Sequence, residues 1–62
     1  MDDKKFKGFM AINDIKQSEI AETLGISLEN ANAKINGRQK FTLEQVKILC
    51  QKYQISADHY FI

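Results

Sequence analysis

Apolar residues along this chain recur mainly at intervals of three and four rather than two. That period lines one face of a helix with apolar side chains, whereas a half-buried strand would alternate them with polar ones. The sequence contains no proline, so no helix interior is broken by one. The pattern therefore predicts an all-α fold. The helices are expected at residues 4–12, 17–24, 28–36, 43–53 and 57–61.

Residues typical of helix starts stand before several of these helices. Thr42 is followed three residues later by Gln45, which is the spacing of a capping box. Ser27 and Ser56 occupy the same position before the third and fifth predicted helices. Lys16 precedes the second helix and is a poor cap, so that start is expected to be weaker. The helix bounds are thus predicted by local chemistry as well as by periodicity.

Gly25 and Gly37 stand where the second and third predicted helices must end. Glycine adopts a positive φ without steric cost, and helices often end on such a residue. The chain has 62 residues, enough for a single domain over 1–62 with a marginal core. The predicted core residues are Phe6, Phe9, Met10, Ile20, Leu24, Leu43, Val46, Leu49, Cys50 and Tyr53.

The second and third predicted helices have the spacing of a helix-turn-helix. Ala21 is small where the two helices would cross, and Gly25 follows four residues later in the turn. Ile26 is expected to be buried beneath the turn, with Ser27 capping the next helix. Ala31 would then pack back towards Ala21. The competing interpretation is an ordinary helical hairpin in a small bundle.

The order of these segments resembles that of the lambda-repressor-like helix-turn-helix family, of the phage repressor and Cro type. Three stretches carry the resemblance, "KQSEIAETLGIS", "NGRQKFTLEQVKILCQKYQIS" and "SADHYF". Together they extend it over nearly the whole chain, from about Phe6 to Phe61. The resemblance implies a compact five-helix domain that binds double-stranded DNA as a transcriptional regulator. Its third helix would lie in the major groove, where each base pair shows a distinct pattern of donors and acceptors.

The resemblance also implies which residues meet DNA. Side chains on the exposed face of the third helix, and one in the loop after it, would contact base edges. Those predicted to read bases are Leu28, Glu29, Asn30, Asn32, Ala33 and Gln39.

A second set would meet the sugar-phosphate backbone, which positions a domain without reading sequence. Its members lie at the start of the second helix and around the end of the third, where Lys34 adds a further positive charge. Those predicted to contact phosphates are Gln17, Ser18, Asn36, Arg38 and Lys40.

Several positions depart from the family pattern. Glu29 is acidic where DNA is acidic, although its carboxylate could accept from a cytosine amino group. Lys34 occupies a slot that is usually apolar, so its stem is expected to lie along the protein with the charge in water. Met10 and Ile35 stand where many members pair an arginine with a glutamate. Both are apolar, and an apolar pair replaces a buried ion pair at little cost.

The net charge of +1 is lower than that of many nucleic-acid binders. A protein-interaction module on the same fold, such as an antirepressor or an antitoxin-like partner, is therefore the alternative to a DNA-binding regulator. Leu28 and Glu29 favour that alternative too. An enzyme is not expected, because His59 is the only histidine and Cys50 the only cysteine. The same count provides no set of metal ligands, and no cofactor is predicted.

A single cysteine excludes an internal disulfide, and the chain begins "MDDKKFKGFM", which lacks the apolar stretch of a signal peptide. No apolar run is long enough to cross a membrane. We therefore expect a cytoplasmic protein. A homodimer is also expected, because proteins of this kind bind two half-sites as two-fold dimers, and a regulatory partner protein remains an option. The predicted dimer interface consists of Ile48, Tyr60, Phe61 and Ile62.

Overall fold

Residues 3–61 fold into a set of short helices in a computed structural model, which describes the side chains of residues 5–61. The all-α prediction is confirmed for these residues, and the observed helix bounds differ from the predicted ones by one residue at most. The helices are α1 (Asp3–Ile12), α2 (Gln17–Leu24), α3 (Leu28–Ile35), α4 (Leu43–Tyr53) and α5 (Ala57–Tyr60).

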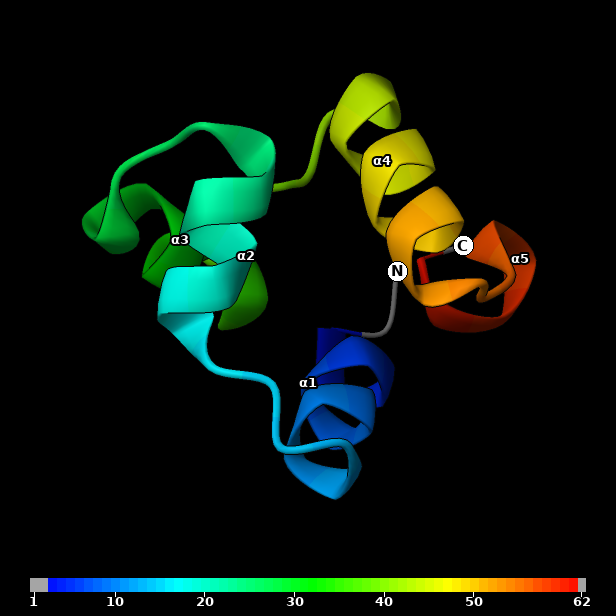
Figure 1. Cartoon of the computed structure of the whole chain (residues 1–62). Coiled ribbons are helices and arrows are strands. Elements are labelled where there is room, and N and C mark those ends of the chain that lie inside the picture. The colour runs from blue at the N-terminus through cyan, green and yellow to red at the C-terminus, as the bar shows by residue number, and fades with distance from the viewer. Residues whose placement is uncertain (1–2, 62) are drawn as a thin grey trace.

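The helices are arranged in two groups joined by α1. Helices α2 and α3 form one side of the molecule, and α4 and α5 form the other (Figure 1). Helix α1 contacts both α3 and α5, while α2 also contacts α4. Within residues 3–61, none of the helices is long and apolar enough to cross a membrane.

The predicted caps form at α3 and α4 but not at α5. The Thr42 hydroxyl accepts from the Gln45 N–H at 3.1 Å, and the Gln45 side chain accepts from the Thr42 N–H at 3.0 Å. The Ser27 hydroxyl accepts from the Asn30 N–H at 3.0 Å. Ser56 makes no such bond through its hydroxyl, so that prediction is wrong. Helix α5 is a single turn, and Ser56 begins it through its carbonyl, which accepts from the Tyr60 N–H.

Both predicted glycine turns adopt the left-handed conformation, with φ of 67° at Gly25 and 82° at Gly37. After Gly25 the Ile26 N–H returns to the Ala21 carbonyl at 3.0 Å, which closes the end of α2. This bond holds Ile26 beneath the turn, where it packs against the core.

Helix α4 ends without a glycine. Gln54 takes a φ of 55° there, and the next residue, Ile55, donates its N–H to the Cys50 carbonyl at 3.1 Å. Ile55 then packs against the core. Packing of the following residue therefore holds Gln54 in a conformation that side chains usually avoid.

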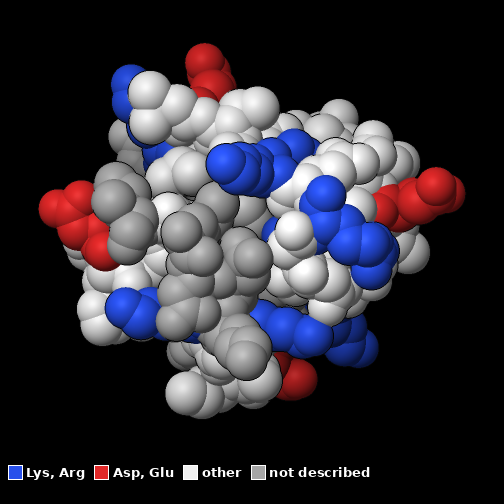
Figure 2. Space-filling view, turned by 180° about the vertical axis from the view of Figure 1, so that it is seen from behind, with Lys and Arg blue, Asp and Glu red and all other residues white. Residues whose placement is uncertain are grey.

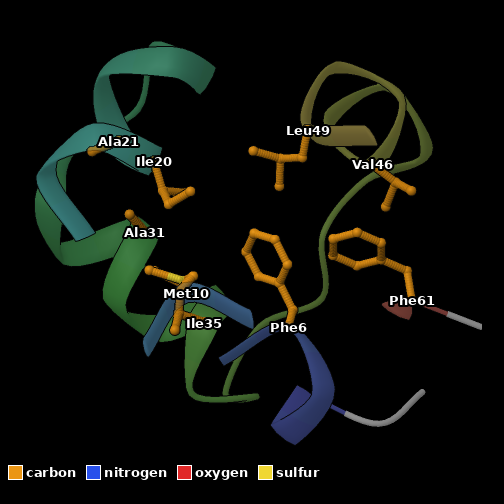
Figure 3. Close-up of a cluster of buried hydrophobic side chains, with 9 residues drawn as sticks. All are labelled: Phe6, Met10, Ile20, Ala21, Ala31, Ile35, Val46, Leu49 and Phe61. Carbon is orange, nitrogen blue, oxygen red and sulfur yellow. The ribbon is translucent and has the colours of Figure 1, made fainter. Parts of the chain in front are cut away.

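The buried core contains residues from α1, α2, α3 and α4 and the residue that follows α5 (Figure 3). Phe6 is at its centre, with ring centroids 4.9 Å from Phe61 and 5.9 Å from Phe41. The aromatic rings of α1 thus close the gap between the loop before α4 and the residue after α5. The buried cluster consists of Phe6, Met10, Ile20, Ala21, Ala31, Ile35, Val46, Leu49 and Phe61.

Leu43 was predicted to lie in this core, and that prediction is wrong because 73% of its surface is exposed. It is the first residue of α4, and Phe41, two residues earlier, packs against the core instead. The pair expected at Met10 and Ile35 is confirmed as apolar and buried, with 5% and 3% exposed.

Candidate nucleic-acid interface

The turn between α2 and α3 brings the two helices close together. Ala21 and Ala31, on facing sides of the two helices, are 6% and 0% exposed, and Ile20 is fully buried beside them. Methyl side chains allow two helix backbones to approach closely, as in the predicted helix-turn-helix. Because α3 is buried through Ala31 and Ile35, its opposite side faces outward.

The outward side of α3 begins with three exposed residues. Leu28 is 55% exposed, and Glu29 and Asn30 are exposed as well. The Asn30 backbone N–H donates to the hydroxyl of Ser27, which caps the helix, and the side-chain amide of Asn30 takes no part in that bond. These side chains are available to a ligand that approaches the start of α3.

Ala33 does not lie on this side. Its expected exposure is wrong, because only 8% of its surface is accessible. After Gly37 the chain folds back over Ala33, whose carbonyl accepts from the N–H groups of Arg38 at 2.8 Å and Gln39 at 3.2 Å. The returning segment thus packs beside Ala33, which was predicted to read a base.

Asn32 is half-buried, and both ends of its amide contact other residues of the chain. Its Nδ2 donates to the Gln17 Oε1 at 3.0 Å, at the start of α2. Its Oδ1 accepts from the Arg38 guanidinium at 2.5 Å, in the segment after α3. Two residues predicted to contact phosphates are thus joined through one predicted to read a base.

Asn36 connects this region to α1. Its Nδ2 donates to the Asn32 carbonyl at 2.9 Å, and its Oδ1 accepts from the Lys7 ammonium at 2.7 Å. The sequence interpretation did not include Lys7 in the candidate site. It lies 29 residues before Asn36, so no local pattern indicates the contact.

Positive side chains gather around the end of α3. Lys34 is half-buried and donates from its ammonium to the Lys40 carbonyl at 2.9 Å, so its stem lies along the protein as expected. Arg38 and Lys40 are exposed beside it, and Lys7 joins them through Asn36. In the view from behind, Lys and Arg side chains cross the face while Asp and Glu stand mainly at its edges (Figure 2). This combination favours an anionic partner.

The sequence profile of the BetR domain matches residues 7–62. The chain belongs to the BetR domain family. Membership indicates a small DNA-binding regulatory domain of the helix-turn-helix kind, which agrees with the close packing of α2 and α3. No curated protein and no solved structure matches the chain.

A polar cluster on this BetR domain joins α2 to α4. The Tyr53 hydroxyl donates to the Glu19 carboxylate at 2.5 Å. The Lys52 ammonium donates to the Thr23 hydroxyl at 2.6 Å and lies 3.8 Å from Glu19. Burial, together with the Glu19 carboxylate, raises the pKa of Tyr53. The cluster orients the helix that precedes the turn.

The predicted dimer residues differ in their accessibility. Phe61 is only 5% exposed because it packs on Phe6 and Phe41, so its assignment to an interface is wrong. Tyr60 is half-buried against Phe9, at 5.2 Å between ring centroids, and Ile48 is half-buried as well. Ile62 lies outside the described residues.

A shallow apolar depression on α4 and α5 was not predicted. Leu43, Val46, Cys50 and Ala57 line it together with two polar side chains of α4. Leu43 is the most exposed of the four apolar residues, and burial raises the pKa of the Cys50 thiol. The sequence signal for this depression is Leu43, an apolar residue at the first position of α4 that helix capping does not require.

Proposed function

We propose that this BetR domain is a sequence-specific transcriptional regulator of the lambda-repressor-like kind. It would act in the cytoplasm as a phage-type repressor or Cro-like protein, without catalysis or a cofactor. Helix α3 would read an operator half-site, with Glu29 and Asn30 at base edges and Leu28 beside them. Gln39 would reach a base from the loop. The observation that carries the proposal is that α3 has an exposed start and a cluster of cations around its end.

The cations supply the affinity in this proposal. Arg38 and Lys40 would neutralise phosphates, with Gln17, Ser18 and Asn36 as neutral donors. Each neutralised phosphate releases counterions, so binding should weaken steeply as salt rises. The cluster includes Lys7, which adds a contact from α1 to those expected from the sequence.

The alternative is a protein-interaction module, such as an antirepressor or an antitoxin-like partner. It is favoured by Leu28, an apolar side chain 55% exposed on the face that would meet bases, and by the acidic Glu29 next to it. A protein surface with an apolar pocket and a positive rim would accept both. In that case the domain would bind a regulatory partner through α3 rather than an operator.

A homodimer is part of the proposed function, because one helix in one half-site gives little affinity. Since Phe61 is buried, the accessible candidates are Tyr60, Ile48 and the depression that contains Leu43. Sedimentation velocity should show a weak dimer at high protein concentration and two copies on one operator. Replacing Leu43 with aspartate should shift the dimer to monomer if the depression is used. A strict monomer in both states would refute the dimer.

Selection of bound duplexes from a random pool tests the regulator directly. Enrichment of a short palindromic site supports it, and the enriched positions identify the bases that α3 reads. A parallel salt titration on random-sequence duplex should give weak binding that falls steeply with salt. If no site is enriched and the titration shows no binding, the interaction module takes its place.

A further inference from the structure

Asn32 connects segments that are far apart in the sequence. Its amide contacts Gln17 on α2 and Arg38 after α3, and its carbonyl contacts Asn36, which in turn contacts Lys7 on α1. A side chain that only reads bases needs no such contacts inside the protein. Both polar atoms of the Asn32 amide are already engaged, whereas the Asn30 amide forms no hydrogen bond with another side chain among residues 5–61.

The contact with Asn32 determines which end of the Gln17 amide is free. Gln17 accepts through Oε1, so its Nε2 group is directed away from Asn32. An amide nitrogen carries two N–H donors and no acceptor. Donors are what a phosphate oxygen requires, so this orientation suits an anion and disfavours a cation.

The same reasoning applies to Arg38, which is exposed. One nitrogen of its guanidinium, Nη2, donates to the Asn32 Oδ1. A guanidinium has five N–H groups in a planar fork, and the bond to Asn32 leaves the remaining donors available. A held side chain loses less conformational freedom when it binds than a free one does.

We propose that Asn32 is a positioning residue, which turns Gln17 and Arg38 towards the same stretch of DNA backbone and reads no base itself. The proposal rests on the proposed DNA-binding function. It reassigns Asn32 from the residues that specify sequence to those that prepare the phosphate contacts. Sequence preference would then depend on Glu29 and Asn30, at the exposed start of α3.

Asn32→Ala tests this, with Asn30→Ala as the matched control on the same helix. Removing Asn32 should weaken binding to the selected operator and to random duplex by the same factor, about two- to tenfold, because two side chains become free to move. The preferred bases should not change, and the salt slope should stay the same because no charge is lost. Asn30→Ala should change the preference at one or two base pairs instead.

A double-mutant cycle supplies the second measurement. Asn32→Ala should cost less in an Arg38→Ala background than in the wild type, because part of its effect passes through Arg38. If Asn32→Ala fails to melt cooperatively, Gln17→Glu and Gln17→Leu replace it. The carboxylate keeps an acceptor for Asn32, but it adds a negative charge and presents an oxygen where the NH₂ group faced the phosphate. Gln17→Glu should therefore bind random duplex more weakly than Gln17→Leu.

The outcomes separate the two proposals. A changed base preference in Asn32→Ala, or independent effects of Asn32 and Arg38 in the cycle, refutes the positioning role while DNA binding stands. Equal binding by Gln17→Glu and Gln17→Leu refutes it in the same way. If the wild-type chain binds no duplex even at low salt, the proposed function fails, and the positioning role fails with it.

Discussion

The salt dependence of DNA binding by the Arg38→Ala variant tests whether this side chain contacts a phosphate. The guanidinium is exposed and donates one hydrogen bond to Asn32, and it forms no ion pair with an acid among the side chains of residues 5–61. If the guanidinium neutralises one phosphate, its loss should make the negative slope of log binding constant against log salt shallower by about 0.9. When salt rises from about 50 to about 200 mM, the ratio of the wild-type binding constant to that of the variant should then fall by about 3.5-fold.

Fluorescence anisotropy on a random-sequence duplex at several salt concentrations measures both slopes. Lys47→Ala is the matched control, because it removes one exposed positive charge from α4, beside the apolar depression. Its slope should equal that of the wild type. An unchanged slope in Arg38→Ala, or an equal reduction in both variants, would show that Arg38 makes no specific contact with phosphate.

Three further predictions concern the recognition face and the stability of the domain. Glu29→Ala should raise affinity for random duplex and reduce discrimination between sites, measured by repeating the selection; if neither changes, the interaction module is favoured. Thr42→Ala should lower the free energy of unfolding by about 1 kcal/mol in urea denaturation, because it breaks a capping box. Ser56→Ala, at a start without a hydroxyl bond, should cost clearly less, and equal costs would contradict the cap. Burial and Glu19 raise the pKa of Tyr53, so the protonated Tyr53 side chain stabilises the fold. This contribution should be complete below the ordinary tyrosine pKa of 10.0 and be lost as pH rises above it. Tyr53→Phe should flatten that alkaline fall in melting temperature, and an identical fall in both proteins would refute the assignment.

The helices could be predicted because their bounds depend on neighbouring residues. Thr42 and Gln45 are three residues apart, and their reciprocal bonds need nothing from the rest of the fold. Gly25 is similar, since a glycine after an apolar period is the usual end of a helix. Gln54 could not be predicted in the same way. Its positive φ follows from the burial of Ile55 against residues distant in the sequence.

The candidate site was harder to predict, because a helical wheel treats α3 as if it were isolated. Ala33 is on the outward side of such a wheel, but the segment after Gly37 folds back and covers it. The contact between Asn32 and Gln17 crosses 15 residues, and the contact between Lys7 and Asn36 crosses 29. Such contacts depend on how the helices pack. Residue spacing alone does not determine them.

Ala31 and Glu29 are two positions apart on α3, yet helix packing constrains only Ala31. Ala31 is fully buried and any larger side chain there would push α2 and α3 apart, whereas Glu29 and Asn30 are exposed. Substitutions at the exposed start of α3 therefore leave folding almost untouched. In a regulator built this way, new operator preferences could arise by single mutations without an intermediate that fails to fold. The same separation makes the start of α3 the natural place to randomise in a library of redirected domains.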